Sequence, residues 1–409
     1  MFILICEYKQ KANIYFIYVV GLTNFEKSMK KNHFNYIICG GGASGLMLAY
    51  RLCNDKFFAN KTILLIEKEN KVLNDRTWCF WESGVGELEK IVHKTWTQSF
   101  FASHNYRLDF NLSPYKYKMI RSHDFYDFMD KNLKLRAQLT KVKDVVIKLE
   151  NNRVFTPKKK YSADLIFSSI IDSKKLFQQK KYPVLQQHFI GQIIETKEKC
   201  FNPDMIQFMN FDIPQKGNTR FMYVLPLSEN RALLEFTLFS SNLLDRQEYL
   251  DEITSFANRL PTGGYRVIEE ENGNIPMTCY RFDQNNNENV LHIGSAGGWT
   301  KPSTGYTFQR INTKTKLLTE YLKLNRPLNQ FHKKNRFWFY DLLFLDVLAN
   351  DNSNGSELFK RMFQKNSPEL IFKFLDEKSN YWEEFQIMKS FKVGKFVRAL
   401  LKRVFNTYD

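Results

Sequence analysis

The sequence predicts an α/β fold in which a parallel, nucleotide-binding sheet is interrupted by an antiparallel sheet and followed by a helical C-terminal region. Three observations lead to this prediction. A short apolar run leads into the glycine cluster of residues 37–45, and helix-forming residues follow it. A second apolar run, residues 61–69, has the continuous hydrophobicity of a strand that is covered on both faces. The middle of the chain instead contains strand-like segments joined by Asn, Pro, Ser and Gly residues.

Length and composition restrict the class of protein. The chain has 409 residues, of which 43% are hydrophobic, so it can bury a large core in one large domain or two ordinary ones. Its formal net charge of +17 favours contact with an anionic surface, such as phospholipid, nucleic acid or an acidic partner. The 37 phenylalanines have two interpretations, which are ordinary core packing and a long apolar binding slot.

Cysteine and histidine residues do not have the spacing of a disulfide framework or a metal site. None of the six cysteines forms a C-x-x-C pair, and the seven histidines are scattered. We therefore predict reduced cysteines and no metal. No apolar run reaches the ~20 residues that a membrane-spanning helix needs.

The N-terminal residues precede the first predicted element. A nucleotide-binding domain of this kind opens directly on its first strand, and Met29 would allow such an opening. We therefore interpret Met29 as the natural start and residues 1–33 as an extension or tail. The first part of the dinucleotide-binding domain is predicted at residues 34–95.

Gly40, Gly42 and Gly45 form the pattern G-x-G-x-x-G between the first strand and its helix. In a Rossmann-like fold these glycines permit a tight turn, a close approach to a pyrophosphate, and close packing of helix on strand. The N-terminus of the helix attracts the anion. Glu67 closes the next strand about 20 residues later, which suits a ribose hydroxyl. The pattern predicts a dinucleotide site, with a purely structural glycine turn as the alternative.

The inserted antiparallel sheet, which would bind substrate, is predicted within residues 96–285. Residues 151–170 and 221–239 both have the pattern of strands joined by turns. The second of these segments is predicted to be a hairpin with its turn at residues 228–231.

Residues 286–325 return to the strand–glycine–helix pattern. Gly294, Gly297 and Gly298 precede a helix that is expected to begin near Ser303. A long insertion followed by such a return resembles FAD-containing two-domain proteins, in which the late glycine turn and helix meet the isoalloxazine ring. A helix N-terminus at that place would stabilise negative charge on a reduced flavin.

The last part of the chain, residues 326–409, has a helical pattern. Residues 388–405 would form a basic amphipathic helix without any acidic residue. Its apolar face carries Val393, Phe396, Val397, Leu400, Leu401 and Val404, and its basic residues are Lys389, Lys392, Lys395, Arg398, Lys402 and Arg403. Such a helix either lies in an anionic membrane interface or packs on the core of its own protein.

The most specific motif is Asn-Asp-Arg-Thr-Trp-Cys-Phe-Trp-Glu at residues 74–82. It resembles the N-D-R-T-W-C-F-W run of the lycopene cyclase family, of the bacterial and plant β-cyclase type. Further segments resemble that family in the same order, over roughly residues 35–400. They are residues 186–196, 201–211, 221–237, 273–277, 294–308 and 374–385.

The sequence departs from the family pattern at two places. The family often has a D-A-R-G-like turn after its third sheet strand, where this chain has Leu-Ile-Phe-Ser-Ser-Ile-Ile-Asp at residues 165–172. The resemblance therefore assigns no FAD contact to that turn. The plant-type L-E-E-T segment is Leu-Glu-Phe-Thr here, so only its first acid, Glu235, remains.

The resemblance implies an FAD/NAD(P)-binding Rossmann-like domain with an inserted substrate sheet. It also implies a lycopene β-cyclase, which closes the linear ends of lycopene into β-ionone rings and produces γ-carotene and β-carotene without net electron transfer. FAD would be bound non-covalently in its reduced form, with NAD(P)H as the reductant. Carried onto this sequence, the cofactor-binding residues are Gly40, Gly42, Gly45, Glu67, Arg76, Gly294, Gly298 and Gly305.

Glu235 is the candidate catalytic acid. Protonation of an alkene needs a neutral acid in a dry pocket, and burial raises the pKa of a carboxyl group. Strand alternation alone would instead point Glu235 to solvent, because Leu234 and Phe236 flank it. The resemblance favours the catalytic role, and the flavin remains an alternative proton donor. Aromatic residues that would shield a carbocation are Trp78, Phe80, Trp81, Trp299 and Tyr306, with core packing as their alternative role.

Two other functions are consistent with the sequence. One is a flavin-dependent monooxygenase or isoprenoid reductase of the same fold, and the other is a non-catalytic basic protein that binds membrane or nucleic acid. No nucleic-acid recognition motif is present, so we expect no nucleic-acid partner. Linear carotenoids are the expected substrates, and the expected location is the cytoplasm, at the inner face of the membrane. The ring type (β or ε), the number of ends that react and the oligomeric state remain open.

Overall fold

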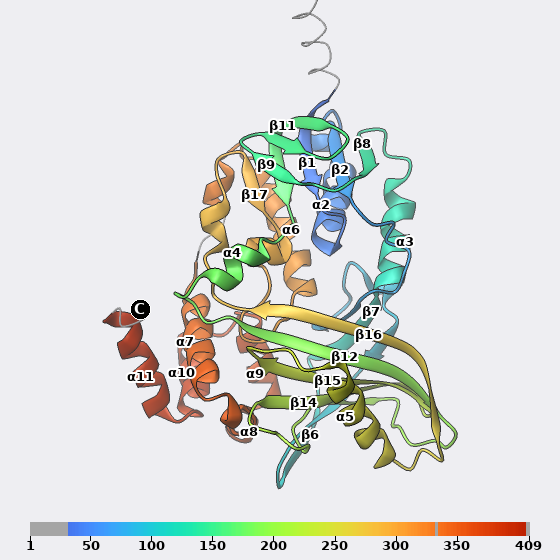
Figure 1. The fold of residues 1–409 in the computed structure, drawn as a ribbon, viewed down its shortest axis with the longest axis vertical. Helices are drawn as coiled ribbons and strands as arrows, with labels where there is room; N and C mark the ends of the chain where they lie inside the picture. Colours follow the sequence, from blue (N-terminus) through green and yellow to red (C-terminus); the bar gives the residue numbers. More distant parts are fainter. Residues whose placement is uncertain (1–31, 332–333, 406–409) are drawn as a thin grey trace, which may run out of the picture.

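The computed structural model describes residues 32–331 and 334–405. The expected start at Met29 and nearly all of the expected N-terminal extension lie outside these residues. Two seven-stranded sheets organise the described chain. Figure 1 shows the first sheet at one end of the molecule, the second at the other end, and the C-terminal helices along one side.

The first sheet is the nucleotide-binding sheet that the sequence predicts. Its parallel strands follow the order β8-β2-β1-β11, and β17 continues the sheet beside β11. The bounds are β1 His33–Cys39, β2 Ile63–Glu67, β8 Leu139–Lys143, β11 Lys160–Ser168 and β17 Val290–His292. The helices that pack on this sheet are α2 Ala43–Asn54, α3 Ser122–Leu133 and α6 Phe308–Leu322.

One segment lies in a different sheet from the predicted one. The sequence predicts residues 151–170 in the inserted sheet, but they provide β10 (Arg153–Phe155) and β11 of the first sheet, with β9 (Lys148–Glu150) as a further edge strand. The reason is that β11 is buried on both faces, since Ile166 and Phe167 belong to separate hydrophobic cores. A strand of that kind belongs inside a parallel sheet.

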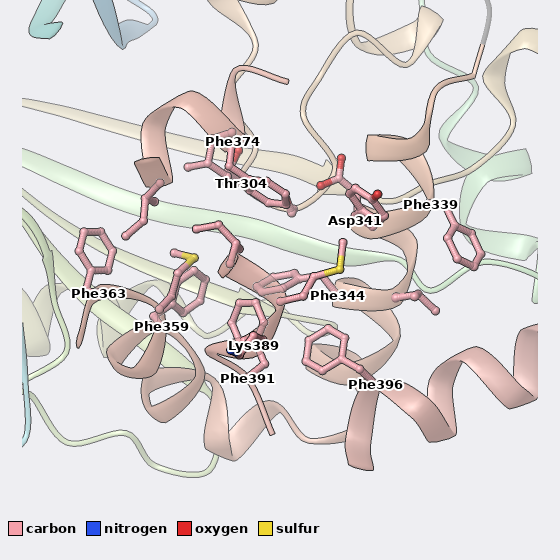
Figure 2. Close-up of a pocket in the computed structure, with 18 of the residues that line it drawn as sticks. Thr304, Phe339, Asp341, Phe344, Phe359, Phe363, Phe374, Lys389, Phe391 and Phe396 are labelled. Atoms are coloured by element: carbon pink, nitrogen blue, oxygen red, sulfur yellow. The ribbon is translucent and has the colours of Figure 1, made fainter. Parts of the chain in front are cut away.

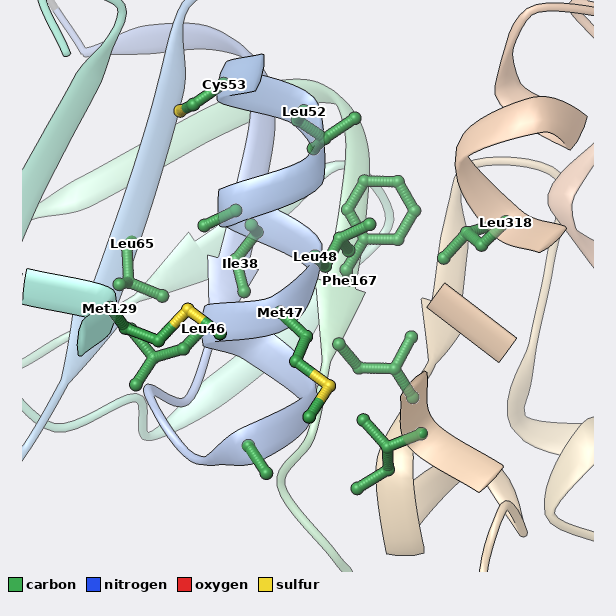
Figure 3. Close-up of a cluster of buried hydrophobic side chains, with 14 of the residues drawn as sticks. Ile38, Leu46, Met47, Leu48, Leu52, Cys53, Leu65, Met129, Phe167 and Leu318 are labelled. Atoms are coloured by element: carbon green, nitrogen blue, oxygen red, sulfur yellow. The ribbon is translucent and has the colours of Figure 1, made fainter. Parts of the chain in front are cut away.

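The core around α2 holds the glycine turn in place. Met47, Leu48 and Leu52 are buried, and their cluster includes Phe167 of β11 and Leu318 of α6, as Figure 3 shows. Strands and helices from the beginning, middle and end of the chain therefore share one core, and this core fixes the early and late glycine turns relative to each other.

The second sheet has the order β16-β12-β15-β14-β13-β5-β6. All neighbours are antiparallel except β13 and β5. The predicted hairpin is confirmed, since Ser228 pairs with Arg231 at its turn. The bounds are β5 Gln98–Ser103, β6 Tyr106–Asn111, β12 Leu185–Thr196, β13 Met205–Asn210, β14 Thr219–Ser228, β15 Arg231–Ser240 and β16 Tyr265–Met277.

Both faces of the second sheet are covered. Helix α5 (Arg246–Asn258) packs on one face, and a second core joins the other face to the C-terminal helices and to a three-stranded sheet. That small sheet consists of β3 Thr77–Ser83, β4 Lys94–Trp96 and β7 Tyr115–Arg121. The shorter helix α4 spans Ser173–Gln178.

The C-terminal region is helical, as predicted. Its helices are α7 Arg336–Asn350, α8 Gly355–Lys365, α9 Pro368–Leu375, α10 Tyr381–Lys389 and α11 Val393–Val404. The basic amphipathic segment expected at 388–405 is thus divided between the end of α10 and α11. Among the described helices, none combines the length and the apolar character needed to cross a membrane. The exact domain boundaries stay a prediction.

Candidate active site

The first glycine turn lies at the carboxyl end of β1. Gly40 has a φ of +102°, which favours glycine, and a Cβ on Gly45 would lie 1.9 Å from the carbonyl oxygen of Gly40. A Cβ on Gly42 would meet no atom within 4 Å, and Gly42 lines a cavity. Two of the glycines therefore shape the turn, whereas the third leaves space at the N-terminus of α2.

The other predicted cofactor residues gather around this turn. The Gly41 N–H donates to Glu67 Oε2 at 2.5 Å, so the acid at the end of β2 lies against the glycines. Gly294 has a φ of +61°, and its Cβ would lie 2.6 Å from Ser44 Oγ, so the late glycine turn packs against the start of α2. Arg76 is exposed and lines the same cavity as Gly42.

A cavity of about 570 Å³ extends from the glycine turn to the second sheet. Its wall combines the start of α2, strand β3, the inner face of the second sheet and residues 304–308. The predicted site residues that line it are Gly42, Arg76, Trp78, Glu235, Gly305 and Tyr306. Residues that are far apart in the sequence therefore face one space.

Other predicted residues lie elsewhere. Phe80 and Trp81 line a neighbouring cavity of about 470 Å³, which shares Tyr306 with the first. Trp299 is only 1% exposed and packs in the core around α2, so it does not line the wall of the 570 Å³ cavity. Gly298, with a φ of +69°, also lies outside that wall, and its Cβ would lie 3.1 Å from Phe282.

Glu235 points into the 570 Å³ cavity from β15. Strand alternation holds, because Leu234 and Phe236 pack under α5 on the opposite face. Glu235 nevertheless does not face bulk solvent, because the face of the sheet opposite α5 is covered as well. The part of its side chain that remains accessible lines the cavity. Desolvation by burial, and then the charge of Glu271, raise the pKa of Glu235 to about 8. The Thr237 hydroxyl donates to Glu235 Oε1 at 2.6 Å.

Two cavity residues were not predicted from the sequence. Glu271 of β16 also lines the cavity and accepts a hydrogen bond of 2.6 Å from the Thr77 hydroxyl. Gln187 faces Gly305, and its buried Oε1 has no hydrogen-bond partner among the described residues. No sequence pattern indicates these residues, because their position depends on which strands of the sheet are neighbours.

Tyr306 is the centre of a buried tyrosine cluster. Its hydroxyl lies 3.0 Å from the hydroxyl of Tyr117 and 3.4 Å from that of Tyr223. Burial raises the pKa of all three phenols, so they stay neutral. Trp81 packs edge-on against Tyr306, with 4.6 Å between the ring centroids.

A second, apolar cavity of about 440 Å³ begins at this cluster. Tyr223, Thr304 and Tyr306 line both this cavity and the 570 Å³ cavity. Ten phenylalanines contribute to its wall, which runs between the second sheet and α7, α8, α9, α10 and α11. Figure 2 shows Phe344, Phe359, Phe391 and Phe396 around this space. The abundance of phenylalanine in the sequence therefore reflects an apolar slot as well as ordinary core.

Residues 301–306 are held by buried charges. Lys301 Nζ lies 2.9 Å from Asp341 and 3.2 Å from Glu377, and all three side chains are largely buried. The Lys301 N–H also donates to the carbonyl oxygen of Tyr306 at 2.9 Å. These contacts attach the loop that carries Thr304 and Tyr306 to the C-terminal helices.

The residues present fit a dinucleotide cofactor such as FAD. The turn at Gly40–Gly45 leaves open space at a helix N-terminus, where a diphosphate is favoured. Glu67 lies beside this turn, and the unpartnered Gln187 oxygen lies farther along the same cavity. An unpartnered buried acceptor is free to accept a hydrogen bond from a bound group or a water molecule.

Comparison with known proteins identifies the family. The family model described as lycopene cyclase protein matches residues 35–403. A lycopene beta-cyclase from Pantoea ananas is 24% identical over 291 residues, covering 67% of this chain and 71% of that protein. A chloroplastic neoxanthin synthase from Solanum tuberosum is 26% identical over 217 residues, covering 48% of this chain and only 42% of that protein.

Solved structures show the fold. A geranylgeranyl bacteriochlorophyll reductase-like protein from Thermoplasma acidophilum matches with a TM-score of 0.55 at 12% identity, over 91% of this chain and 99% of that one. The flavin-dependent brominase Bmp2 matches with a TM-score of 0.53 at 12% identity, over 92% and 99%. The chain therefore has the Rossmann-like fold of flavin-dependent enzymes, which confirms the predicted fold class.

Proposed function

The chain belongs to the lycopene cyclase protein family, and we propose that it is a lycopene β-cyclase that closes the linear ends of lycopene into β-ionone rings. One observation carries the proposal. A buried carboxyl group whose pKa is raised to about 8 lines a cavity between a dinucleotide turn and an apolar slot. These are the requirements of a proton-initiated reaction on a hydrocarbon.

In the proposed reaction, Glu235 donates its proton to the terminal double bond of the substrate. The tertiary cation that results is attacked by the next double bond, which forms the ring, and a second proton leaves the ring cation. The product is therefore an isomer of the substrate. When bound, reduced FAD would supply negative charge beside the cation, and NAD(P)H would keep it reduced. Thr237 orients the Glu235 carboxyl group through its hydrogen bond.

The surrounding side chains would protect the cation from water. Trp78 lines the cavity and is held by stacking on Phe308, with 4.9 Å between the ring centroids. Tyr306 contributes another ring from the loop that precedes α6. Aromatic faces attract cations, and the exclusion of water prevents the addition of water to the cation. The apolar slot would hold the rest of the polyene chain.

A flavin-dependent reductase or monooxygenase is the second candidate, because solved structures with the same fold include such enzymes. The two candidates differ in stoichiometry. A reductase or monooxygenase consumes one reduced nicotinamide for each product molecule, whereas an isomerase consumes none after its flavin is reduced.

Expression in a lycopene-accumulating bacterium tests the proposed function. We expect the extracted pigment to change from lycopene to β-carotene, with γ-carotene as the intermediate, and we expect purified protein with reduced FAD to form rings without matching loss of NADPH. Chromatography of the carotenoids separates β-rings from ε-rings. Unchanged lycopene, or NADPH loss equal to product, would reject the cyclase in favour of the second candidate.

We further propose that α10 and α11 bind the surface of an anionic membrane, at the inner face of which the protein would work. Val393, Leu401 and Val404 of α11 are 63%, 49% and 63% exposed. Residues 386–405 contain six Lys or Arg residues and no acid. Lys395 and Arg403 pair with Asp351 and Asp346, and the remaining positive charge of the segment complements anionic lipid. The same helices form part of the wall of the apolar slot, so a hydrocarbon dissolved in the membrane would enter near them.

Substitution of Leu401 and Val404 by Glu tests this surface. We expect the double variant to bind vesicles that contain anionic phospholipid at least about tenfold more weakly, because it loses apolar contacts and introduces repulsion. Sedimentation with vesicles measures the binding, which should also weaken as salt is added. The matched control is Leu135→Glu, at a position that is 91% exposed on a different part of the molecule. Equal binding by the double variant and the control would contradict the proposed surface.

A further inference from the structure

Glu235 has a second carboxyl group as its neighbour on the same face of the sheet. Strand β12 lies between β15 and β16, and Gly191 of β12 is the register partner of both Glu235 and Glu271. A Cβ on Gly191 would lie 3.5 Å from Glu235 Cβ and 3.4 Å from Glu271 Cγ. Because Gly191 has no side chain, β12 leaves a notch between the two glutamates at this register.

Glu271 is built into the site from a second direction. Its carboxylate accepts the hydrogen bond of Thr77, which belongs to the aromatic motif of residues 74–82 and lies on β3. Glu271 also lines the same cavity as Glu235 and Trp78. The neighbouring Glu270, in contrast, points to the other face, where it pairs with Arg246 and Gln192. Glu269 lies on the same face as Glu271, but it pairs with Arg121 and does not line the cavity, so Glu271 is the acid of this run that the cavity wall contains.

We propose that Glu271 is the base of the reaction, which takes the proton that leaves the ring cation and returns it to Glu235 across the notch at Gly191. This inference rests on the proposed cyclase function. The protons balance over one turnover. The Glu235 O–H bond breaks as a C–H bond forms on the substrate, and a C–H bond of the ring cation breaks as an O–H bond forms on Glu271. Transfer of that proton to Glu235 restores both groups, so no oxidant, reductant or net proton is needed.

The charges around the pair are consistent with opposite protonation states. Burial raises the pKa of Glu271 as well, and the hydrogen bond of Thr77 and the charge of Arg76 counteract that rise. Glu235 has no cation among the causes of its pKa shift. When the two carboxyl groups share a single proton, that proton is therefore on Glu235 and the negative charge is on Glu271. The other groups that act on Glu271 or face the pair are Glu269, Arg121, Cys79, Tyr117 and Tyr223.

The test is the pair of variants Glu271→Gln and Glu270→Gln, assayed as FAD-bound proteins with lycopene in detergent micelles. We expect Glu271→Gln to lower kcat by about 10²-fold with KM nearly unchanged, because the base is lost and the binding surface is kept. On the alkaline side of the pH profile, the rate of Glu271→Gln should fall at a lower pH than the rate of the wild type. The reason is that loss of the neighbouring carboxylate lowers the pKa of Glu235. Glu270→Gln should keep the wild-type kcat and pH profile.

A second variant covers the case in which Glu271→Gln does not fold. Gly191→Ala places a methyl group in the notch, 3.1 Å from Leu233 Cδ1, 3.4 Å from Glu271 Cγ and 3.5 Å from Glu235 Cβ, so the Leu233 and Glu271 side chains must shift slightly to receive it. It should lower kcat while the fold and FAD content stay intact. A wild-type kcat and pH profile for Glu271→Gln, or for Gly191→Ala where the first variant is misfolded, would overturn the role of Glu271 while the cyclase function stands. Absence of cyclic product from the unaltered chain would reject both.

Discussion

Replacing Glu235 with Gln is expected to lower the rate of ring formation by about 10²–10⁴-fold, the range that a lost general acid commonly produces. Gln has nearly the same shape and can still accept the hydrogen bond of Thr237, so FAD binding and the fold should remain. What the variant lacks is a proton that it can transfer to an alkene. Product formation by the purified variant, with reduced FAD and lycopene, measures the effect.

The pH dependence gives an independent check on the same residue. Because the protonated form of Glu235 is the active one, the wild-type rate should decline as the pH rises through about 8. The pKa in the folded protein is above the ordinary value of 4.5, so the stability that this group contributes is fully present below about 4.5 and is lost as the pH rises through about 8. Glu235→Gln should remove that loss and be more stable than the wild type at neutral pH. Full cyclase activity in the variant would show that another group delivers the proton.

The sequence predicts the first sheet and its cofactor turn well, because these features are local. An apolar strand, three glycines and a helix occupy consecutive residues, and each glycine has its own steric reason. The structure brings the turn at Gly40–Gly45 together with Glu67 and Gly294, as expected for a βαβ unit and its late return. The sheet predicted for residues 160–168 is wrong because strand periodicity does not identify the neighbouring strand.

The cavity is predicted less well, because its composition depends on contacts between distant elements. Alternation along β15 correctly predicts that Glu235 lies on the opposite face of the sheet from Leu234 and Phe236. It cannot show that other elements cover both faces of that sheet. Glu271 becomes visible only when β12 is known to lie between β15 and β16. Trp299 is predicted to line the pocket because it belongs to the motif of residues 294–308. Its ring instead packs in the hydrophobic core around α2.

Gly42 and Gly45 are expected to respond very differently to alanine. A methyl group on Gly45 would meet the carbonyl oxygen of Gly40 at 1.9 Å, and backbone cannot move away without displacing α2 from β1. We therefore expect Gly45→Ala to destabilise the FAD-free protein by about 1–3 kcal/mol or more, as overpacking does. Gly42 has a φ of −77°, which alanine readily adopts, and a methyl group there would meet no atom within 4 Å, so Gly42→Ala should leave the melting temperature of the FAD-free protein unchanged.

The same two variants then separate the structural turn from the cofactor site. Gly42 lines the cavity where the backbone must approach a pyrophosphate, so a methyl group there should weaken FAD binding by at least about tenfold, which corresponds to about 1.4 kcal/mol. Added FAD should raise the melting temperature of the wild type but raise that of Gly42→Ala much less, because the stabilisation depends on the affinity for the ligand. Thermal unfolding with and without FAD, together with a fluorescence titration of FAD, measures both effects. If FAD stabilised Gly42→Ala as strongly as the wild type, the cofactor would have to bind away from this turn, and the assignment of Glu235 to a flavin-adjacent cavity would have to be abandoned.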